Sequence, residues 1–549
     1  METWTYSFEQ GDHSNLLLIG GKGAGLAEMM RSGLPVPPGF IITTAACRAY
    51  YAKGKVFPEG MWSQSNAGIK AIEEKTGKRF GDPANPLLVS VRSGAPVSMP
   101  GMLDTVLNLG LNAQTLKGLA QLTQDERFAW DAYRRFVQMF AEIVLGVPKV
   151  KLYGAFESVK ARVNRQRDAD LDVDALRTII DRFKEIIFAE DHQEVPEDPE
   201  EQLRLAIAAV FDSWMKRRAV DYRLLNRISG DVGTAVNIQA MVFGNAGDDS
   251  ATGVAFTRNP NTGEPVLFGE YLTNAQGEDV VAGIRTPFPI QHMAEAMPAT
   301  FQQLLDIAHR LEAHYRDMQD IEFTIERGRL WILQTRSGKR TGNAAIRVAV
   351  DLVNQEVITR QEAIQRLDLK QLDQLLHPII DSTAHVKVVA CGLPASPGAA
   401  SGIVIFSADE AVACAARGEK VILVRDDTSP TDFHGMVASQ AIVTARGGIT
   451  SHAAVVARGM GKCCVVGCDA LKIDYNQQLL NVGDLKISRS DWITVDGTHG
   501  RILLGQVPTI NPELDENLKT LINWANDPAT KQTRTQSSND SGAKSSHSG

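Results

Sequence analysis

Residues 445–459 read Ala-Arg-Gly-Gly-Ile-Thr-Ser-His-Ala-Ala-Val-Val-Ala-Arg-Gly. A strand-like apolar run, residues 441–444, precedes this stretch, and the pair Gly447-Gly448 breaks the strand. Ser451 stands shortly before an Ala/Val-rich segment, and serine is one of the preferred residues at a helix N-cap. The stretch therefore predicts a strand, a glycine turn and a helix, with His452 in the first helical turn.

The position of His452 points to phosphoryl chemistry. The unpaired N–H groups and the positive end of the helix dipole favour a phosphate at a helix start. An imidazole with an ordinary pKa of about 6.5 is largely neutral near pH 7 and can attack phosphorus without a separate base. The alternative, that His452 is a cap-region or core residue, stays open from spacing alone. His434 and His499 do not follow a glycine turn into a helix, and we assign them structural roles.

Length and composition limit the class of protein. A chain of 549 residues with 44% hydrophobic and 22% charged residues has the size of two or three soluble domains. The net charge of -8 argues against an extended nucleic-acid surface, which would need clustered lysine and arginine. No segment reaches the about 18 apolar residues of a membrane span, and the N-terminus does not resemble a signal peptide. We expect a cytoplasmic protein that binds neither nucleic acid nor membrane.

The N-terminal part of the chain contains two candidate phosphate contacts. Residues 16–19 predict a short buried strand, followed by a glycine-rich turn at 20–25 that carries Lys22, and then by a helix. A lysine on such a turn can approach a polyphosphate, although a solvated lysine is the ordinary alternative. Residues 87–94 predict an apolar strand that carries Arg92 near its end. The loop that follows, residues 95–105 with Gly101, is rich in Gly, Pro and Ser and is a candidate lid.

A hairpin is predicted from residues 320–324 and 330–336. Strand alternation puts Asp320 and Glu322 on one face of the first strand, and Gln334 and Arg336 on one face of the second. Oxygen ligands suit Mg²⁺, which commonly binds one or two carboxylates together with nucleotide phosphates, and a guanidinium can bind a phosphate oxygen. A cross-strand ion pair on a solvated sheet is the alternative. Residues 337–342 mark a boundary after this hairpin.

Several of these segments resemble one family. Residues 450–462 resemble the phosphohistidine motif of the pyruvate phosphate dikinase family, including the Thr-Ser pair before the histidine. The related phosphoenolpyruvate synthases usually carry Cys in place of Ser451, which favours the dikinase branch. The segments around Lys22 and Arg92 resemble the family's ATP-grasp nucleotide-binding domain. The chain departs from that pattern at residues 96–97, where many members carry a further basic residue.

The resemblance implies an α+β and α/β multidomain protein. We expect an ATP-grasp-like nucleotide-binding domain at 1–340 with a helical insertion at about 116–228, a helical linker at 341–385, a swivelling phosphohistidine domain at 386–505, and a linker remnant with a disordered tail at 506–549. In full-length dikinases a (β/α)₈ barrel of about 250 residues follows and binds pyruvate and phosphoenolpyruvate. We expect this chain to lack that barrel.

The resemblance also implies roles for individual residues. The expected ATP- and phosphate-binding residues are Lys22, Arg92, Gly101, Asp320, Glu322, Gln334 and Arg336. Glu322 and Gln334 would hold Mg²⁺, His452 would carry the phosphoryl group, and Thr450 is a candidate regulatory position.

The expected reaction is phosphorylation of His452 by ATP and phosphate, with release of AMP and pyrophosphate. Onward transfer to pyruvate would need a separate pyruvate/PEP-binding subunit, and a homodimer is left open. A synthase-like enzyme would use water in place of phosphate, and an antibiotic phosphotransferase would need a further acceptor domain that no unassigned segment supplies. The alternative from a different class is a catalytically silent or regulatory fragment that binds ATP or binds a kinase acting on Thr450.

Overall fold

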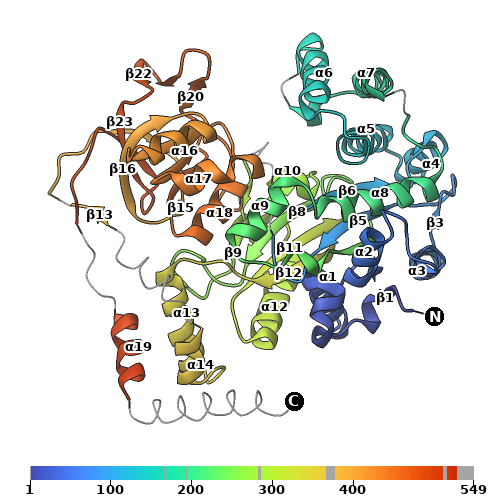
Figure 1. The fold of residues 1–549 in the computed structure, drawn as a ribbon, viewed down its shortest axis with the longest axis horizontal. Helices are drawn as coiled ribbons and strands as arrows, with labels where there is room; N and C mark the ends of the chain where they lie inside the picture. The colour runs from blue at the N-terminus through green and yellow to red at the C-terminus, as the bar shows by residue number, and fades with distance from the viewer. Residues whose placement is uncertain are drawn as a thin grey trace. The chain divides into compact units, whose positions relative to one another are not determined.

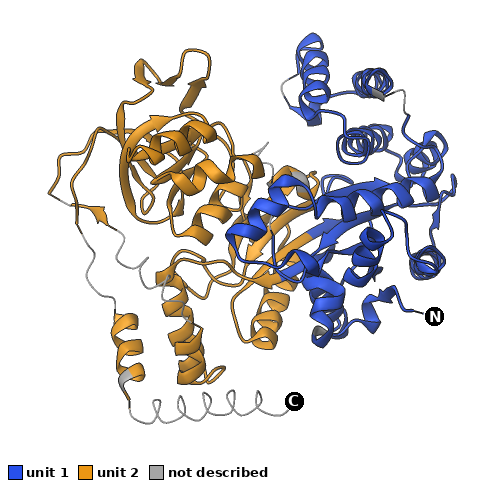
Figure 2. Cartoon of the chain, viewed as in Figure 1, with its two compact units in different colours: residues 1–250, 324–335 blue, residues 251–323, 336–549 orange. Residues whose placement is uncertain are grey.

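The structure is a computed structural model that describes residues 2–99, 101–165, 167–191, 194–281, 286–366, 378–381, 383–510 and 516–527 (Figure 1). The chain divides into two compact units (Figure 2). Unit 1 contains residues 1–250 and 324–335, and unit 2 contains residues 251–323 and 336–549. This division follows packing, and the predicted domain limits at 340, 385 and 505 stay predictions.

Unit 1 is built on an antiparallel sheet. Its strand order is β1 (Thr5–Ser7), β2 (Gly39–Ile42), β7 (Ala235–Ala240), β5 (Val89–Gly94) and β6 (Thr105–Leu109). Every residue of the central strand β7 is buried, so both faces of the sheet are covered there. Helices α1 (Leu16–Arg31) and α8 (Pro199–Ser213) both pack on β5.

The middle of unit 1 is helical, as the hydrophobic periodicity predicts. The helices here are α4 (Ala113–Thr123), α5 (Glu126–Ile143), α6 (Lys149–Arg162), α7 (Val173–Asp191), α8 and α9 (Arg217–Leu225). Helix α5 begins after Asp125, whose carboxylate accepts a hydrogen bond from the N–H of Phe128. Its apolar face buries Phe136 and Phe140 in the main core of the unit.

The prediction of a strand at residues 16–19 is wrong. These residues form the first turn of α1, and Leu17 is 71% exposed. A short apolar run has no periodicity that separates a strand from a helix. The glycine-rich segment is a kink in that helix, because Gly20 has φ 72° and ψ 163°. A β carbon on Gly20 would lie 1.8 Å from the carbonyl oxygen of Gly94, so the close approach of α1 to the end of β5 requires glycine.

A second sheet has the order β10 (Phe288–Pro289), β9 (Phe268–Thr273), β8 (Ala251–Phe256), β11 (Gln319–Glu326) and β12 (Arg329–Ser337). The predicted hairpin is confirmed as β11 and β12. Its turn residues Arg327 and Gly328 have φ values of 48° and 75°, which suit a two-residue hairpin turn. After the hairpin come α13 (Gly342–Asn354) and α14 (Arg360–Gln365), as expected for a helical connector.

The C-terminal part of unit 2 contains a mixed eight-stranded sheet. Its order is β14 (Val388–Cys391), β24 (Arg501–Leu504), β23 (Trp492–Asp496), β16 (Ala399–Ile405), β17 (Val421–Arg425), β18 (Ala441–Thr444), β19 (Cys463–Val466) and β15 (Leu393–Ser396). Strands β16 to β19 are parallel and are joined by α16 (Ala408–Ala416), α17 (Phe433–Ala438) and α18 (His452–Met460). These helices lie together in Figure 1 and share one hydrophobic core with the sheet. The predicted α/β organisation is confirmed.

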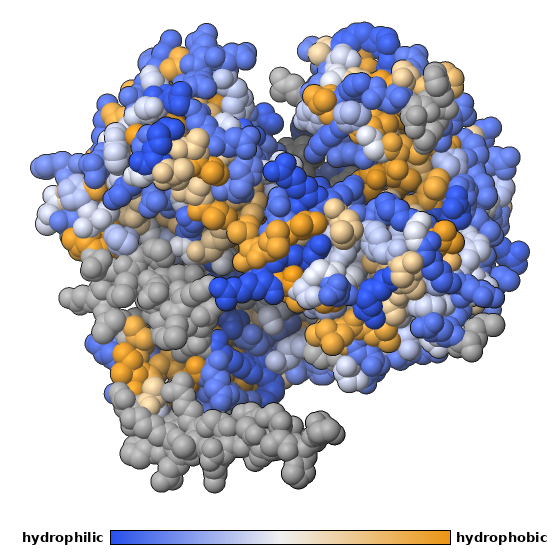
Figure 3. Space-filling view, viewed as in Figure 1, coloured by the Kyte–Doolittle hydropathy of each residue, from blue (hydrophilic) through white to orange (hydrophobic). Residues whose placement is uncertain are grey.

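Some predictions fall outside the described residues. They are the end of the helical connector at 367–377 and the disordered tail at 531–549. Helix α19 (Glu516–Asn526) lies within the segment predicted as a linker remnant. Within the described ranges, no helix has both the length and the hydropathy needed to cross a membrane. Hydrophilic residues dominate the face in Figure 3, and hydrophobic residues are scattered among them.

Candidate phosphoryl-transfer site

The glycine turn and helix predicted around His452 are confirmed. Gly447 has φ 94°, the N–H of Ser451 donates to the carbonyl of Gly448 at 3.0 Å, and Ser451 has the extended backbone of an N-cap. His452 is the first residue of α18. The ring therefore stands where the free N–H groups of the helix favour an anion.

The environment of His452 keeps its imidazole neutral. The residue is half-buried, and no described residue forms a hydrogen bond with its buried Nε2. Burial lowers the pKa of His452 to about 4, Asp432 opposes this shift, and the positive charge of Lys339 adds to it. A neutral imidazole with an unshared nitrogen lone pair is the nucleophilic form.

Glu270 of β9 holds the turn that leads to His452. Its carboxylate accepts hydrogen bonds from Ile449 N at 3.0 Å, Thr450 N at 3.3 Å and Thr450 Oγ1 at 3.0 Å. Glu270 is 5% exposed, and burial raises its pKa while these hydrogen bonds lower it. A β carbon on Gly448 would lie 2.3 Å from Glu270 Oε2, so glycine is needed for this approach. We call this set of contacts the Glu270 clamp.

Arg458 supports the same turn from inside α18. Its guanidinium is 2% exposed, donates to the carbonyl of Ile449, and lies 5.6 Å from the ring centre of Phe256. Burial lowers the pKa of Arg458 to about 10, and Asp320 and Glu270 act in the opposite direction. The turn is therefore held by the Glu270 carboxylate and by the Arg458 guanidinium.

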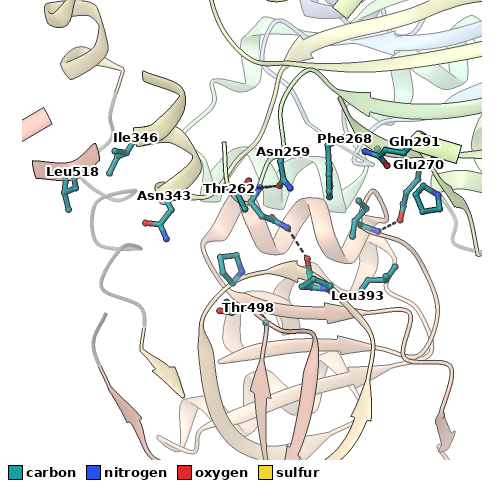
Figure 4. A pocket seen from close by; sticks show the side chains of 17 residues that line it. Asn259, Thr262, Phe268, Glu270, Gln291, Asn343, Ile346, Leu393, Thr498 and Leu518 are labelled. Atoms are coloured by element: carbon teal, nitrogen blue, oxygen red, sulfur yellow. Dashed lines mark hydrogen bonds between the residues drawn. The ribbon is translucent and has the colours of Figure 1, made fainter. Parts of the chain in front are cut away.

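The Glu270 clamp forms part of the wall of a cavity of about 670 Å³ (Figure 4). Other wall residues include Asn259, Asn261 and Phe268, and Asn261 donates to the carbonyl of Pro394 at 3.1 Å. His452 does not line this cavity.

The predicted carboxylates and arginine of the β11–β12 hairpin come together in unit 2. Asp320 accepts a hydrogen bond from Arg336 Nε at 2.7 Å, and Glu322 lies 3.9 Å from Arg336 Nη2. Asp320 therefore forms an ion pair across the hairpin, which was the alternative to a ligand site. The second carboxylate oxygen of Asp320, Oδ1, is buried and accepts no hydrogen bond from the described residues. That oxygen can still bind a cation or a ligand donor.

Unit 1 brings together the N-terminal candidates. The N–H of Gly21 donates to the carbonyl of Ala95 at 2.9 Å, and a β carbon on Gly94 would lie 3.5 Å from that of Lys22. Arg92 donates to the carbonyl of Leu333 at 3.4 Å, directly before Gln334 in β12. Lys22 and Arg92 therefore lie at the same end of β5.

The candidate lid after β5 is held by contacts with α9. Gly101 has φ 72° within this loop, and Arg218 Nε donates to the carbonyl of Met102 at 3.1 Å. Lys216 forms an ion pair with Asp104 at 2.6 Å, and Tyr222 donates to the carbonyl of Ser98 at 3.4 Å. In this state the loop is anchored to the helix.

Sequence reasoning missed Glu270, Arg458 and Lys339. Glu270 stands in an otherwise uncharged strand that becomes buried, which is the signal that could have marked it. Within the described part of the chain, no group of three or more His, Cys, Asp or Glu has the arrangement of a metal site.

Two protein-family models match the parts of the chain that carry the candidate site residues. The family described as "Pyruvate phosphate dikinase, AMP/ATP-binding domain" matches residues 16–65, 55–298 and 291–356. The family described as "PEP-utilising enzyme, mobile domain" matches residues 417–500, which include the turn and helix of His452.

Similar curated proteins carry the same family name. Pyruvate, phosphate dikinase of Rhizobium meliloti (strain 1021) is 50% identical, with 100% of this chain and 63% of that protein covered. Pyruvate, phosphate dikinase 1, chloroplastic, of Arabidopsis thaliana is 51% identical, with 94% of this chain and 54% of that protein covered. Pyruvate, phosphate dikinase of Clostridium symbiosum is 50% identical, with 97% of this chain and 62% of that protein covered. The chain spans 54% to 63% of the length of these relatives. The first family covers more than half of the chain, and the chain therefore belongs to the pyruvate phosphate dikinase family.

Proposed function

We propose that this chain carries out the ATP- and phosphate-dependent half-reaction of a pyruvate, phosphate dikinase-type phosphotransferase, with His452 as the phosphoryl carrier. The observation that carries the proposal is the neutral, unpartnered ring nitrogen of His452 at the start of α18. Membership of the family supports the choice of ATP as the donor.

The proposed half-reaction has two balanced steps. In the first, a nitrogen of His452 bonds to the β phosphorus of ATP, the bond from that phosphorus to the oxygen bridging to the α phosphorus breaks, and AMP leaves with that oxygen. In the second, an oxygen of phosphate bonds to the γ phosphorus and the bond from the γ phosphorus to its bridging oxygen breaks. Phospho-His452 and pyrophosphate are then the products.

The proposed roles of the other residues are electrostatic. Lys22, Arg92 and Arg336 would neutralise charge on the phosphates, because phosphoryl transfer is catalysed mainly by positioning and charge stabilisation. Gly101 would let the backbone of the loop after β5 approach the nucleotide. The domain limits predicted from the sequence, including an ATP-grasp-like domain at 1–340 and a swivelling domain at 386–505, belong to this proposal.

Mg²⁺ is the proposed cofactor. Glu322 and Gln334 would hold it, and Asp320, two residues before Glu322, is a further oxygen donor. All three side chains present oxygen atoms, which this ion prefers, and the buried Asp320 Oδ1 has spare capacity to accept. When bound, Mg²⁺ supplies positive charge that neutralises nucleotide phosphates.

Pyruvate is the proposed final acceptor, because the relatives are named for it. A pyruvate/PEP-binding subunit is a proposed partner for this transfer. Thr450 is the proposed regulatory position: its hydroxyl bonds to Glu270 and the residue is 6% exposed, so a kinase would need the turn to leave the Glu270 clamp. A phosphate on Thr450 would then oppose its return by like-charge repulsion. A cytoplasmic location and a homodimer remain predictions.

Labelled ATP tests the proposed function. Protein incubated with ATP labelled at the β phosphorus, Mg²⁺ and phosphate should acquire acid-labile, base-stable label. His452→Ala should abolish the label, while His434→Ala, which changes an exposed histidine of the same region, should retain it. Release of orthophosphate in place of pyrophosphate would favour a synthase-like enzyme, and an unlabelled wild-type protein would refute the proposal.

A further inference from the structure

The cavity of about 670 Å³ beside the Glu270 clamp has the size of a small-molecule site, since such sites measure about 300–1,000 Å³. Its wall is formed within unit 2 by β9 and the segments that flank it, by α13 and α19, and by β15 and loops of the eight-stranded sheet. Figure 4 shows Ile346 and Leu518 on one side of the cavity and Phe268 and Glu270 on the other. The same wall includes Ile449, so it contains both partners of one clamp hydrogen bond.

Most of this wall is apolar. Ile346 and Leu518 are 1% and 9% exposed, and Phe268 packs against the same hydrophobic cluster. Leu393 packs against the core that α18 shares with its sheet. Two prolines and the clamped turn complete the apolar surface with Pro289, Pro397 and Ile449. A ligand therefore binds here mainly by burying apolar surface.

The charges of the wall exclude an anionic ligand. Of the described residues that line the cavity, none is Lys, Arg or His, and Glu270 is the one carboxylate. Both oxygens of Glu270 already accept hydrogen bonds from the turn, and the positive charge of Arg458 acts on the same carboxylate. An anion would lose water here and meet no opposite charge, which is costly. The cavity therefore suits a neutral molecule and not a nucleotide or phosphate.

One acceptor of the wall lacks a donor. The side chain of Asn261 is oriented by its Nδ2 atom, which donates to the carbonyl of Pro394 at 3.1 Å. A carbonyl can only accept, so this bond assigns the other atom of the amide as Oδ1. Asn261 Oδ1 is buried and accepts no hydrogen bond from the residues that the structure describes. The neighbouring Asn259 differs, because its Oδ1 accepts from Asn261 N at 2.9 Å.

We propose that this cavity binds a neutral, largely apolar molecule whose N–H or O–H group donates to Asn261 Oδ1. The donor satisfies the buried acceptor, whose desolvation is otherwise uncompensated. Asn261 is held in place for this contact, because Thr341 Oγ1 donates to its carbonyl at 2.9 Å. The apolar part of the ligand fills the space between α13, α19 and β9.

The bound molecule also stabilises the closed Glu270 clamp. It contacts the strand of Glu270 and the side chain of Ile449 together, and the amide of Ile449 donates to Glu270 at 3.0 Å. A ligand that binds one conformation preferentially increases the population of that conformation. This consequence rests on the proposed function, in which the turn before His452 leaves Glu270 after phosphorylation, and the ligand delays that release. The binding site itself does not depend on it.

Three aromatic probes of one shape test the ligand class. Phenyl-α-naphthylamine is neutral, has one N–H group and fluoresces in apolar surroundings. Anilinonaphthalene sulfonate adds a negative charge to this skeleton, and α-benzylnaphthalene replaces the N–H by CH₂ and is measured by competition. The amine should bind saturably, and both analogues should bind about tenfold more weakly, the effect of about one hydrogen bond. Equally tight binding of the sulfonate would refute the neutral class, and equal affinity for the hydrocarbon would refute the contact with Asn261.

Two variants locate the probe. Thr262 is an exposed residue of the wall, so Thr262→Trp fills the cavity without changing the core and should weaken binding of the amine at least about tenfold. Asn476→Trp, at an exposed position outside the wall, is the matched control and should bind as the wild type does. Asn261→Ala should abolish the preference for the amine over the hydrocarbon. Thermal unfolding checks the fold of each variant, and an unchanged affinity in folded Thr262→Trp would overturn the site.

Hydrogen exchange measures the effect on the clamp without turnover. The amides of Ile449 and Thr450 both donate to Glu270, and peptides that span this turn report their exchange. The amine at ten times its Kd should slow this exchange about tenfold in the wild type and not in Thr262→Trp. Unchanged exchange with the probe bound would overturn the effect on the clamp. A wild type that binds the amine but takes up no label from ATP would refute the proposed function and leave the site standing.

Discussion

Replacement of Glu270 by Gln should weaken the Glu270 clamp and slow phosphorylation of His452. In the wild type one carboxylate oxygen accepts from Ile449 N, and the other accepts from the amide and the hydroxyl of Thr450. Glutamine has one acceptor oxygen, and its NH₂ group cannot accept from the Thr450 amide. If the oxygen keeps the bond from Ile449, both bonds from Thr450 are lost.

The magnitude follows from these two bonds. A hydrogen bond to a charged group contributes about 1.5–3 kcal/mol. The hydroxyl of Thr450 can rotate to accept from the new NH₂ group and recover part of that energy, so we expect a net loss of about 2–3 kcal/mol. If His452 reacts while the clamp is formed, the labelling rate falls by up to about 30- to 150-fold, since each 1.4 kcal/mol is a factor of ten.

The assay is the initial rate of acid-labile label uptake from ATP labelled at the β phosphorus. Glu264→Gln is the matched control, because Glu264 lies in the same unit and its contact with Arg347 is long, at 3.6 Å, and solvent-exposed. Glu264→Gln should keep the wild-type rate. A Glu270→Gln protein that unfolds at the wild-type temperature and labels at the wild-type rate would refute the role of the clamp.

Three further predictions concern pH, backbone conformation and metal. Burial lowers the pKa of His452 to about 4, below the ordinary value of about 6.5, so the unfolded chain binds the extra proton first as the pH falls. The contribution of His452 to stability should therefore decrease as pH drops from about 6.5 to 4. Urea midpoints of His452→Gln that depend on pH with the same slope as those of the wild type would contradict this. Gly20→Ala should destabilise unit 1 by more than about 2 kcal/mol, because its β carbon would lie 1.8 Å from the Gly94 oxygen. Gly54 has a similar φ of 68° and nothing within 4 Å of a β carbon, so Gly54→Ala should cost only the backbone strain of about 1 kcal/mol. Equal urea midpoints of the two variants would exclude the steric explanation. Chelation of divalent cations should abolish labelling of His452 and added Mg²⁺ should restore it, and labelling that persists in excess chelator would exclude the proposed cofactor.

Local signals in the sequence predicted many elements of the fold correctly. The start of α18 was predicted because a strand, two glycines and a serine cap are features of neighbouring residues. The β11–β12 hairpin was predicted because alternation and a tight turn are equally local. Residues 16–19 were predicted wrongly because four apolar residues fit a strand and a helix turn equally well, and so short a run has no periodicity that separates the two.

The sequence by itself determined which type of chemistry we propose, since the residues around His452 and the family resemblance are properties of the chain order. The tertiary structure decided which charges act on that histidine. Glu270 and Ile449 are 179 positions apart, and the charge of Lys339 reaches an imidazole more than a hundred positions later in the chain. Such contacts depend on which strands and helices pack together. Burial then sets their electrostatic strength, and neither can be obtained from the spacing of neighbouring residues.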